Sequence, residues 1–218
     1  MKRPARREPS RWRPENAVSP DAPITGIVLV GVGGQGILLA TQIAARAALM
    51  AGHDVKTNEV HGMAQRGGSV VAQIRYGAKV YSPLVPEGTA RVLLSLERIE
   101  ALRFASLLAP DGLAVVSSQS IIPVTVSSGQ ASYPADAEER LRRRFPRLVY
   151  VDAAAVGEKL CDTRVANVVL LGALSTALDL GDESWSDAIA QCVKPRFIDI
   201  NRKAFEEGRK LAAAVSPR

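Results

Sequence analysis

The sequence predicts an α/β fold: a Rossmann-like, doubly wound and mostly parallel sheet with C-terminal helices. Short apolar, β-branched runs such as residues 26–30 and 91–96 are typical of buried parallel strands. Helical patterns such as residues 35–51 alternate with these runs, and after residue 152 the pattern is helical throughout. Strands that alternate with helices favour a parallel sheet with helices on both faces.

The remaining elements follow from the same periodicities. Strands are expected, in order, at residues 26–30, 54–60, 69–76, 91–96, 113–117 and 148–151. Helices are expected at residues 35–51, 97–108, 135–145, 153–160, 164–178, 185–193 and 195–214. Pro110-Asp111-Gly112 predicts a turn, Ser184 a helix cap, and residues 121–133 an extended strand or hairpin arm.

Positive charge is concentrated at the start of the chain. Residues 1–20 hold six basic and two acidic side chains, which is +4 of the net charge of +6 over 218 residues. The other 22 basic and 20 acidic side chains nearly balance, so no nucleic-acid-binding face is needed to explain the basic composition. We expect residues 1–22, which contain four prolines, to be a disordered basic tail, and residues 23–218 to be a single domain.

The cysteines and the hydropathy restrict the class of protein. Cys161 and Cys192 are the only cysteines, which are too few for a disulfide framework or for the four thiolates of an iron–sulfur cluster. No run reaches the ~18 consecutive apolar residues of a membrane helix. The sequence therefore predicts a cytoplasmic protein with no membrane or nucleic-acid partner and no metal site of its own.

A glycine-rich turn joins the first strand to the first helix. Residues 31–36 have the pattern G-x-G-x-x-G, whose glycines permit a tight bend, close backbone approach and helix–sheet packing. The N–H groups at the start of the helix favour an anion. The candidate cofactor-binding or subunit-interface residues of this turn are Gly31, Gly33, Gly34, Gln35 and Gly36.

A free-standing NAD(P)-binding dehydrogenase or a nucleotide-binding regulatory module is the alternative that this motif allows. Such a site needs an acidic residue at the end of the second strand, and Glu59 is the candidate. However, only His53 and His61 are available as histidines for a proton relay, and no obvious hydride-transfer residue follows. The pattern therefore favours a different function.

A second glycine-rich loop, residues 61–68, follows the second strand. Its three glycines allow a positive φ or close backbone approach, and its polar side chains stand where binding residues are common. We therefore expect contact with a ligand or partner subunit rather than a purely structural turn. The candidate residues are His61, Gln65, Arg66, Gly67 and Gly68.

Together, residues 31–37 and 59–69 resemble the gamma domain of 2-oxoacid:ferredoxin oxidoreductases. Within that family, the chain is most similar to the beta subunit of indolepyruvate ferredoxin oxidoreductase. Residues 167–174 resemble the family's Asn-led helix, which adds Asn167 to the candidate residues, and residues 201–208 resemble its C-terminal helix. One departure is Cys161-Asp162, which stands where a Gly-Asn turn is more usual.

The resemblance implies an enzyme that decarboxylates a 2-oxoacid on thiamine pyrophosphate, reduces ferredoxin through [4Fe-4S] clusters and forms an acyl-CoA. This chain has neither the cysteines nor the Gly-Asp-Gly motif for those cofactors. Thiamine pyrophosphate, Mg and the clusters are thus expected in a large alpha subunit, with coenzyme A as co-substrate. This chain is expected to be the non-catalytic small subunit of an indolepyruvate (arylpyruvate) enzyme, with Arg66 as an anion contact.

Overall fold

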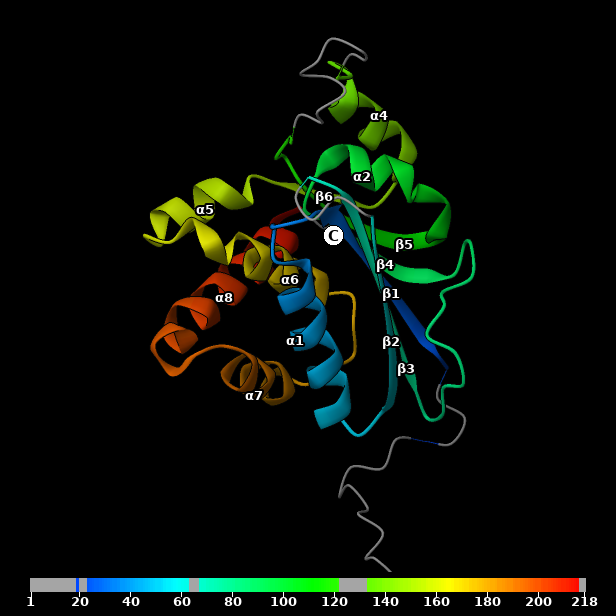
Figure 1. The fold of residues 1–218 in the computed structure, drawn as a ribbon, viewed down its shortest axis with the longest axis vertical. Helices are drawn as coiled ribbons and strands as arrows, with labels where there is room; N and C mark the ends of the chain where they lie inside the picture. Colours follow the sequence, from blue (N-terminus) through cyan, green and yellow to red (C-terminus); the bar gives the residue numbers. More distant parts are fainter. Residues whose placement is uncertain (1–18, 20–22, 63–66, 122–132, 216–218) are drawn as a thin grey trace, which may run out of the picture.

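The computed structural model describes residues 19, 23–62, 67–121 and 133–215. Most of the expected tail and most of residues 121–133 lie outside the described residues. Six strands form one sheet in the order β2-β3-β1-β4-β5-β6 (Figure 1). The strands are β1 (Thr25–Val32), β2 (Asp54–His61), β3 (Ser69–Gly77), β4 (Ala90–Ser95), β5 (Leu108–Ser117) and β6 (Leu148–Val151). β3 is antiparallel to both of its neighbours, and the other pairings are parallel.

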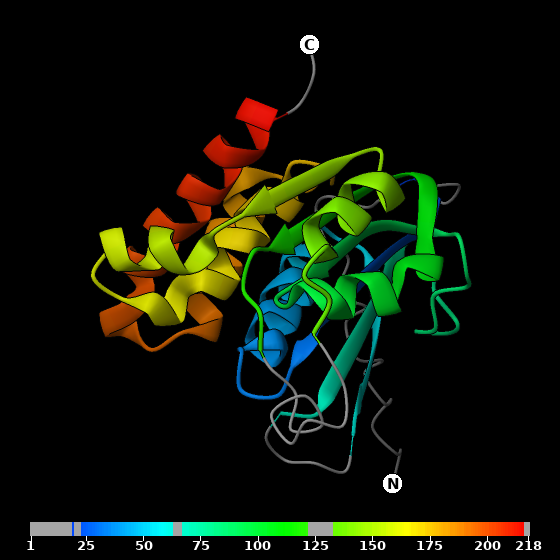
Figure 2. The ribbon, with the colours of Figure 1, turned by 90° about the horizontal axis from the view of Figure 1, so that it is seen from above.

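Helices cover both faces of this sheet (Figures 1 and 2). The α-helices are α1 (Ile37–Met50), α2 (Arg98–Arg103), α4 (Ala137–Arg144), α5 (Ala153–Lys159), α6 (Ala166–Ser175), α7 (Asp182–Cys192) and α8 (Ile198–Val215). The short 3-10 helices are η1 (Ala105–Leu107), η2 (Thr163–Val165) and η3 (Pro195–Phe197). The predicted fold class is confirmed. Within the described ranges, every helix is too short or too polar to cross a membrane.

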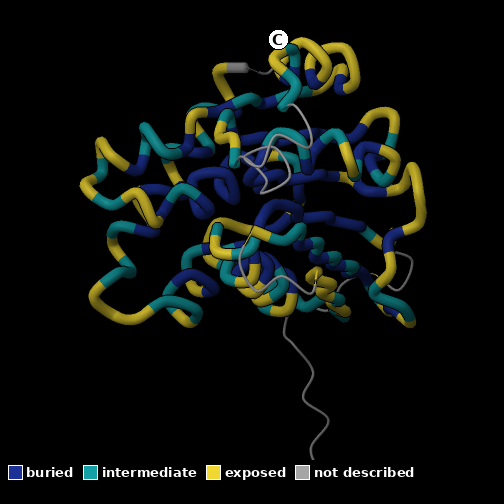
Figure 3. The backbone as a smooth tube through the Cα atoms, turned by 45° about the horizontal axis from the view of Figure 1, so that its top comes forward, coloured by how far each residue is buried: buried dark blue, intermediate teal, exposed yellow. Residues whose placement is uncertain are grey.

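The apolar side chains of β1 supply two separate cores because successive strand residues point to opposite faces. Ile27 and Leu29 pack in the larger core, which α1, α6, α7 and α8 cover. Val28 and Val30 pack in the smaller core beneath α2 and α4. Figure 3 shows a buried centre of the sheet, and β1 and β4 are buried along nearly their whole length, which is why these two strands read as continuous apolar runs.

Two glycines allow α6 to lie directly against α8. A Cβ atom on Gly172 would stand 1.9 Å from the carbonyl oxygen of Phe205, and one on Gly208 would stand 1.8 Å from that of Val169. All residues of α6 from Asn167 to Ser175 are buried. The close contact therefore places this helix, including its first polar residue, in the centre of the helical layer.

Three sequence expectations are wrong in detail. The helix expected at residues 97–108 ends at Arg103. The short helix η1 follows it, and β5 begins at Leu108. Pro110-Asp111-Gly112 is not a free turn: Leu108 pairs with Ala90 and Leu113 with Val92, so these residues form an irregularity inside β5. The helix expected from residue 185 begins at Asp182 with Gly181 as its N-cap, so Ser184 is not the cap.

Candidate functional site: the carboxyl edge of the sheet

The glycine turn lies at the carboxyl end of β1, where parallel α/β sheets usually bind ligands. Gly34 and Gly36 have φ values of +102° and +82°, which disfavour other residues. A Cβ atom on Gly36 would also stand 2.6 Å from Nδ2 of Asn167. Gly36 is therefore required both by its backbone conformation and by the approach of α6.

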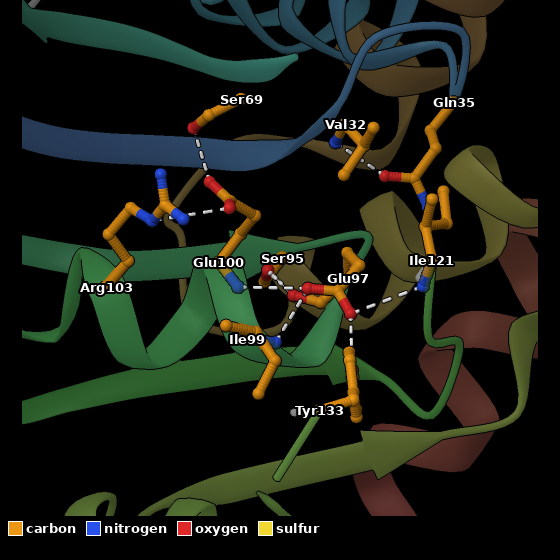
Figure 4. Close-up of polar contacts among 10 residues, drawn as sticks. All are labelled: Val32, Gln35, Ser69, Ser95, Glu97, Ile99, Glu100, Arg103, Ile121 and Tyr133. Carbon is orange, nitrogen blue, oxygen red and sulfur yellow. Dashed lines mark hydrogen bonds and ion pairs between the residues drawn. The ribbon is translucent and has the colours of Figure 1, made fainter. Parts of the chain in front are cut away.

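The side chain of Gln35 closes the turn from inside (Figure 4). Its Oε1 atom accepts a hydrogen bond of 2.7 Å from the N–H of Val32. Its Nε2 atom donates to the carbonyl oxygen of Leu96 at 2.8 Å and to Oε1 of Gln119 at 3.0 Å. A Cβ atom on Gly31 would stand 2.7 Å from Gln35 Oε1. Contacts within the chain thus account for glycine at position 31 without a ligand.

The position of β2 disagrees with the dinucleotide-binding alternative. In a dinucleotide-binding fold, the acidic residue stands at the end of the strand that lies beside the one leading into the glycine motif, which here is β1. Here β3 lies between β1 and β2 and runs the opposite way, so Glu59 is exposed on an edge strand about 10 Å from β1. The residues present do not fit NAD(P).

The structure brings the two glycine-rich segments together. The N–H of Gly33 in the first segment donates to the carbonyl oxygen of Gly68 in the second at 2.9 Å. The N–H of Gly62 donates to the carbonyl oxygen of Ser69 at 3.1 Å, which closes the base of the second segment. Gly67 has a φ of +78° and is exposed, as is His61 at the end of β2. Gln65 and Arg66 lie outside the described residues.

An apolar pocket of about 580 Å³ lies between these segments. Its lining combines the glycine turn, the start of α1, His61 and Val70. Leu38, one of the lining residues at the start of α1, is 47% exposed. An exposed apolar side chain at the rim of an apolar pocket is typical of a surface that another molecule covers. Of the described lining residues, only His61 is titratable. The pocket is therefore better suited to binding an apolar group than to catalysing proton transfer.

Sequence reasoning missed a buried carboxylate network below this edge. Glu97 is 2% exposed and accepts hydrogen bonds from the N–H groups of Ile99 and Glu100 at 2.7 and 3.0 Å (Figure 4). It also accepts a hydrogen bond of 2.6 Å from the hydroxyl of Tyr133, and burial followed by this bond raises the pKa of Tyr133 to about 12. An acidic residue directly after an apolar strand run was the available signal for this N-cap.

Glu100 connects the same helix to the second loop. It is 5% exposed and accepts a hydrogen bond from the hydroxyl of Ser69, the first residue of β3. Arg103 lies 3.4 Å from the other carboxylate oxygen. α2 therefore fixes the point where the 61–68 loop rejoins the sheet.

Asn167 is buried and bonded on both sides of its amide. Its Oδ1 atom accepts a hydrogen bond of 2.9 Å from the N–H of Val168, and its Nδ2 atom donates to the carbonyl oxygen of Gly36 at 3.0 Å. This candidate residue thus links α6 to the first turn of α1. Cys161 has a φ of +63°, a left-handed conformation that strains any residue with a side chain.

The residues present do not fit the cofactors that the family resemblance implies for the complex. Cys161 is exposed and Cys192 is half-buried, and a [4Fe-4S] cluster needs four thiolates. Across the part of the chain that the structure describes, no group of three or more His, Cys, Asp or Glu side chains is placed to hold a metal ion.

Comparison with known proteins identifies the family. A family model described as "Pyruvate ferredoxin/flavodoxin oxidoreductase" matches residues 26–211. The chain is 43% identical over 196 residues to the "Indolepyruvate oxidoreductase subunit IorB" of Archaeoglobus fulgidus, covering 88% of this chain and 96% of the relative. It is also 43% identical to the protein of that name from Thermococcus kodakarensis, covering 85% and 95%.

A solved structure supports the fold. The gamma subunit of a keto/oxoacid ferredoxin oxidoreductase from Geobacter sulfurreducens superposes with a TM-score of 0.68 at 23% identity, covering 90% of this chain and 100% of that one. The resemblance based on residues 31–37 and 59–69 is confirmed. The chain belongs to the pyruvate ferredoxin/flavodoxin oxidoreductase family.

Proposed function

We propose that this chain is the small subunit of a thiamine pyrophosphate- and iron–sulfur-dependent indolepyruvate (arylpyruvate):ferredoxin oxidoreductase. The complex decarboxylates the 2-oxoacid, passes two electrons to ferredoxin and forms an acyl-CoA. The observation that carries the proposal is the 43% identity, over 88% of the chain, to a protein named as an indolepyruvate oxidoreductase subunit. The lack of a suitable thiol set supports placing the clusters in a large alpha subunit.

The surface that contacts this large subunit is the carboxyl edge of the sheet, which is formed by residues 31–36, the start of α1 and His61. The apolar pocket between the glycine turn and His61, together with the exposed side chain of Leu38, supports this assignment. The internal closure of the turn by Gln35 also supports it, because the turn then presents a preformed backbone surface rather than an empty phosphate site. Gly33, Gly34 and Gly36 belong to this contact surface.

The 61–68 loop supplies the polar part of the contact, through His61, Gln65, Gly67 and Gly68. Arg66 contacts an anion at this edge, either the 2-oxoacid carboxylate or a coenzyme A phosphate, because a guanidinium can bind such groups with two hydrogen bonds. In the assembled complex, Arg66→Ala raises the Michaelis constant for that anion, whereas Arg143→Ala on exposed α4 leaves it unchanged. Equal constants in the two variants would contradict this role.

Anaerobic purification of the chain through a C-terminal tag tests the subunit assignment. We expect a brown complex with one large cysteine-rich partner. Leu38→Gln weakens retention of that partner, whereas Leu49→Gln does not, since Leu49 is similarly exposed at the other end of α1. A colourless protein that purifies without a partner and binds NAD(P) would overturn the proposal.

A further inference from the structure

A second pocket, of about 370 Å³, lies where the C-terminal end of α7 meets η3 and the start of α8. It shares Leu39 with the apolar pocket, but its other lining residues come from η2, α7, η3, α8 and the positions that flank these helices. Its apolar wall is formed by Leu39, Val165, Val193 and Phe197. Its volume lies within the range of pockets that bind small molecules.

The charged side chains around this wall are mainly cationic. Arg164 binds both carboxylate oxygens of Asp162, at 2.8 and 2.7 Å. This pairing lowers the pKa of Asp162 to about 2, so the carboxylate stays ionised at neutral pH. Lys194 and Arg196 also line the pocket and are exposed, and neither forms an ion pair with any described residue. Three cations against one carboxylate leave a net charge of +2.

The two arginines are held around a single aromatic ring. The guanidinium carbons of Arg164 and Arg196 lie 5.1 and 4.7 Å from the centre of the Phe197 ring. Contact with the ring favours both positions. Because Arg164 is already paired with Asp162, Arg196 is the arginine of the two that has no carboxylate partner among the described residues.

We propose that this pocket binds an organic oxyanion, namely a carboxylate or phosphate monoester attached to a small apolar body. Arg196 and Lys194 take the oxyanion, because they are the cations without a carboxylate partner in the described structure. The apolar body lies against Val165, Val193 and Leu39. This site adjoins the proposed subunit contact at Leu39, but its cations lie outside that contact, and it does not depend on the proposed oxidoreductase function.

Calorimetric titration of the full-length chain tests the site with four probes: phenyl phosphate, phenylacetate, inorganic phosphate and benzyl alcohol. We expect phenyl phosphate or phenylacetate to bind at least about tenfold more tightly than inorganic phosphate or benzyl alcohol, because only the first two carry both a charged and an apolar part. Tighter binding of phenyl phosphate would indicate a phosphate ligand, and tighter binding of phenylacetate would indicate a carboxylate ligand.

Arg196→Gln is expected to weaken this binding by about tenfold or more, since a charge-assisted contact is lost. Arg142→Gln on α4 also removes an exposed arginine, one that does not line this pocket, and is expected to leave the binding unchanged. Arg196 is exposed, so thermal melting should be the same for both variants. The proposal is overturned if neither aryl probe binds, if Arg196→Gln has no effect, or if binding is lost in Leu38→Gln instead.

Discussion

The Nδ2 atom of Asn167 donates a hydrogen bond of 3.0 Å to the carbonyl oxygen of Gly36, although the two residues are 131 positions apart. Gly36 caps α1, and Asn167 is the second residue of α6. The bond therefore couples the glycine turn to the helical layer, and the missing Cβ of Gly36 makes room for it.

Asn167→Asp is expected to lower the free energy of unfolding by about 2 kcal/mol, because a buried carboxylate cannot donate to the Gly36 carbonyl. Chemical denaturation measures the change. Gln191→Glu makes the same amide-to-acid change on the exposed side of α7 and should stay within about 0.5 kcal/mol. Equal losses in the two variants would show that the Asn167–Gly36 bond does not stabilise the fold.

Gly31→Ala tests the closure of the turn by Gln35. The added Cβ would meet Gln35 Oε1 at 2.7 Å, so the single variant is expected to be destabilised by about 2 kcal/mol. In a double-mutant cycle, Gln35→Ala should recover about 1 kcal/mol of this loss by removing the oxygen. Additive effects of the two substitutions would mean that Gln35 is not what keeps position 31 small.

Gly208→Ala is expected to separate α6 from α8. Because its Cβ would stand 1.8 Å from the Val169 carbonyl oxygen, we expect a loss of at least about 3 kcal/mol or failure to fold. Gly62→Ala is the control, since its Cβ would lie 3.8 Å from the carbonyl oxygen of Ser69, which is an ordinary contact. Comparable melting temperatures for the two variants would contradict the close helix contact.

Cys161→Gly is expected to stabilise the chain by about 0.5–1 kcal/mol, because a residue with a side chain is strained at a φ of +63°. Cys161→Ala keeps the Cβ atom and removes only the thiol, so it should give no such gain. Denaturant unfolding under reducing conditions measures both. A gain in the alanine variant alone would attribute the effect to the thiol rather than to the backbone.

His53 is expected to make stability depend on pH. Burial lowers the pKa of His53 from 6.5, although a hydrogen bond with the Gly77 backbone opposes the shift. The unfolded chain therefore takes up this proton at a higher pH than the native chain. Its contribution is present above pH 6.5 and is lost as the pH falls through 6.5 towards the lower native pKa.

Urea unfolding between about pH 7 and pH 5.5 tests this dependence. We expect His53→Gln to lose less stability over that interval than the unmodified chain. His61→Gln should behave like the unmodified chain, because His61 is exposed. The same pH dependence in all three proteins would exclude His53 as the cause.

Local patterns predicted most of the fold. The apolar runs of β1, β4 and β6 and the helical period of α1 were sufficient, because burial on known faces decides those residues. Pro110-Asp111-Gly112 has the composition of a turn, but pairing of Leu108 with Ala90 extends β5 across it. The start of α7 was misplaced because the acidic residues at 182 and 183 form its first turn, ahead of Ser184.

The glycine motifs predicted where the candidate site lies, but not how its parts are held. Gln35 was recognised as a candidate, whereas its partners Leu96 and Gln119 follow 61 and 84 positions later. The bond between Glu97 and Tyr133 spans 36 positions. No local periodicity encodes such contacts, because they depend on which strands become neighbours in the sheet.

The most direct test of the subunit assignment is to add purified chain stepwise to its isolated large partner. The quantity measured is the arylpyruvate- and coenzyme A-dependent reduction of a viologen dye. If this chain is the small subunit, neither protein is active alone, and activity rises with added chain until the two are equimolar. Full activity of the partner without this chain would contradict the subunit assignment, as would NAD(P)-dependent activity of the chain alone.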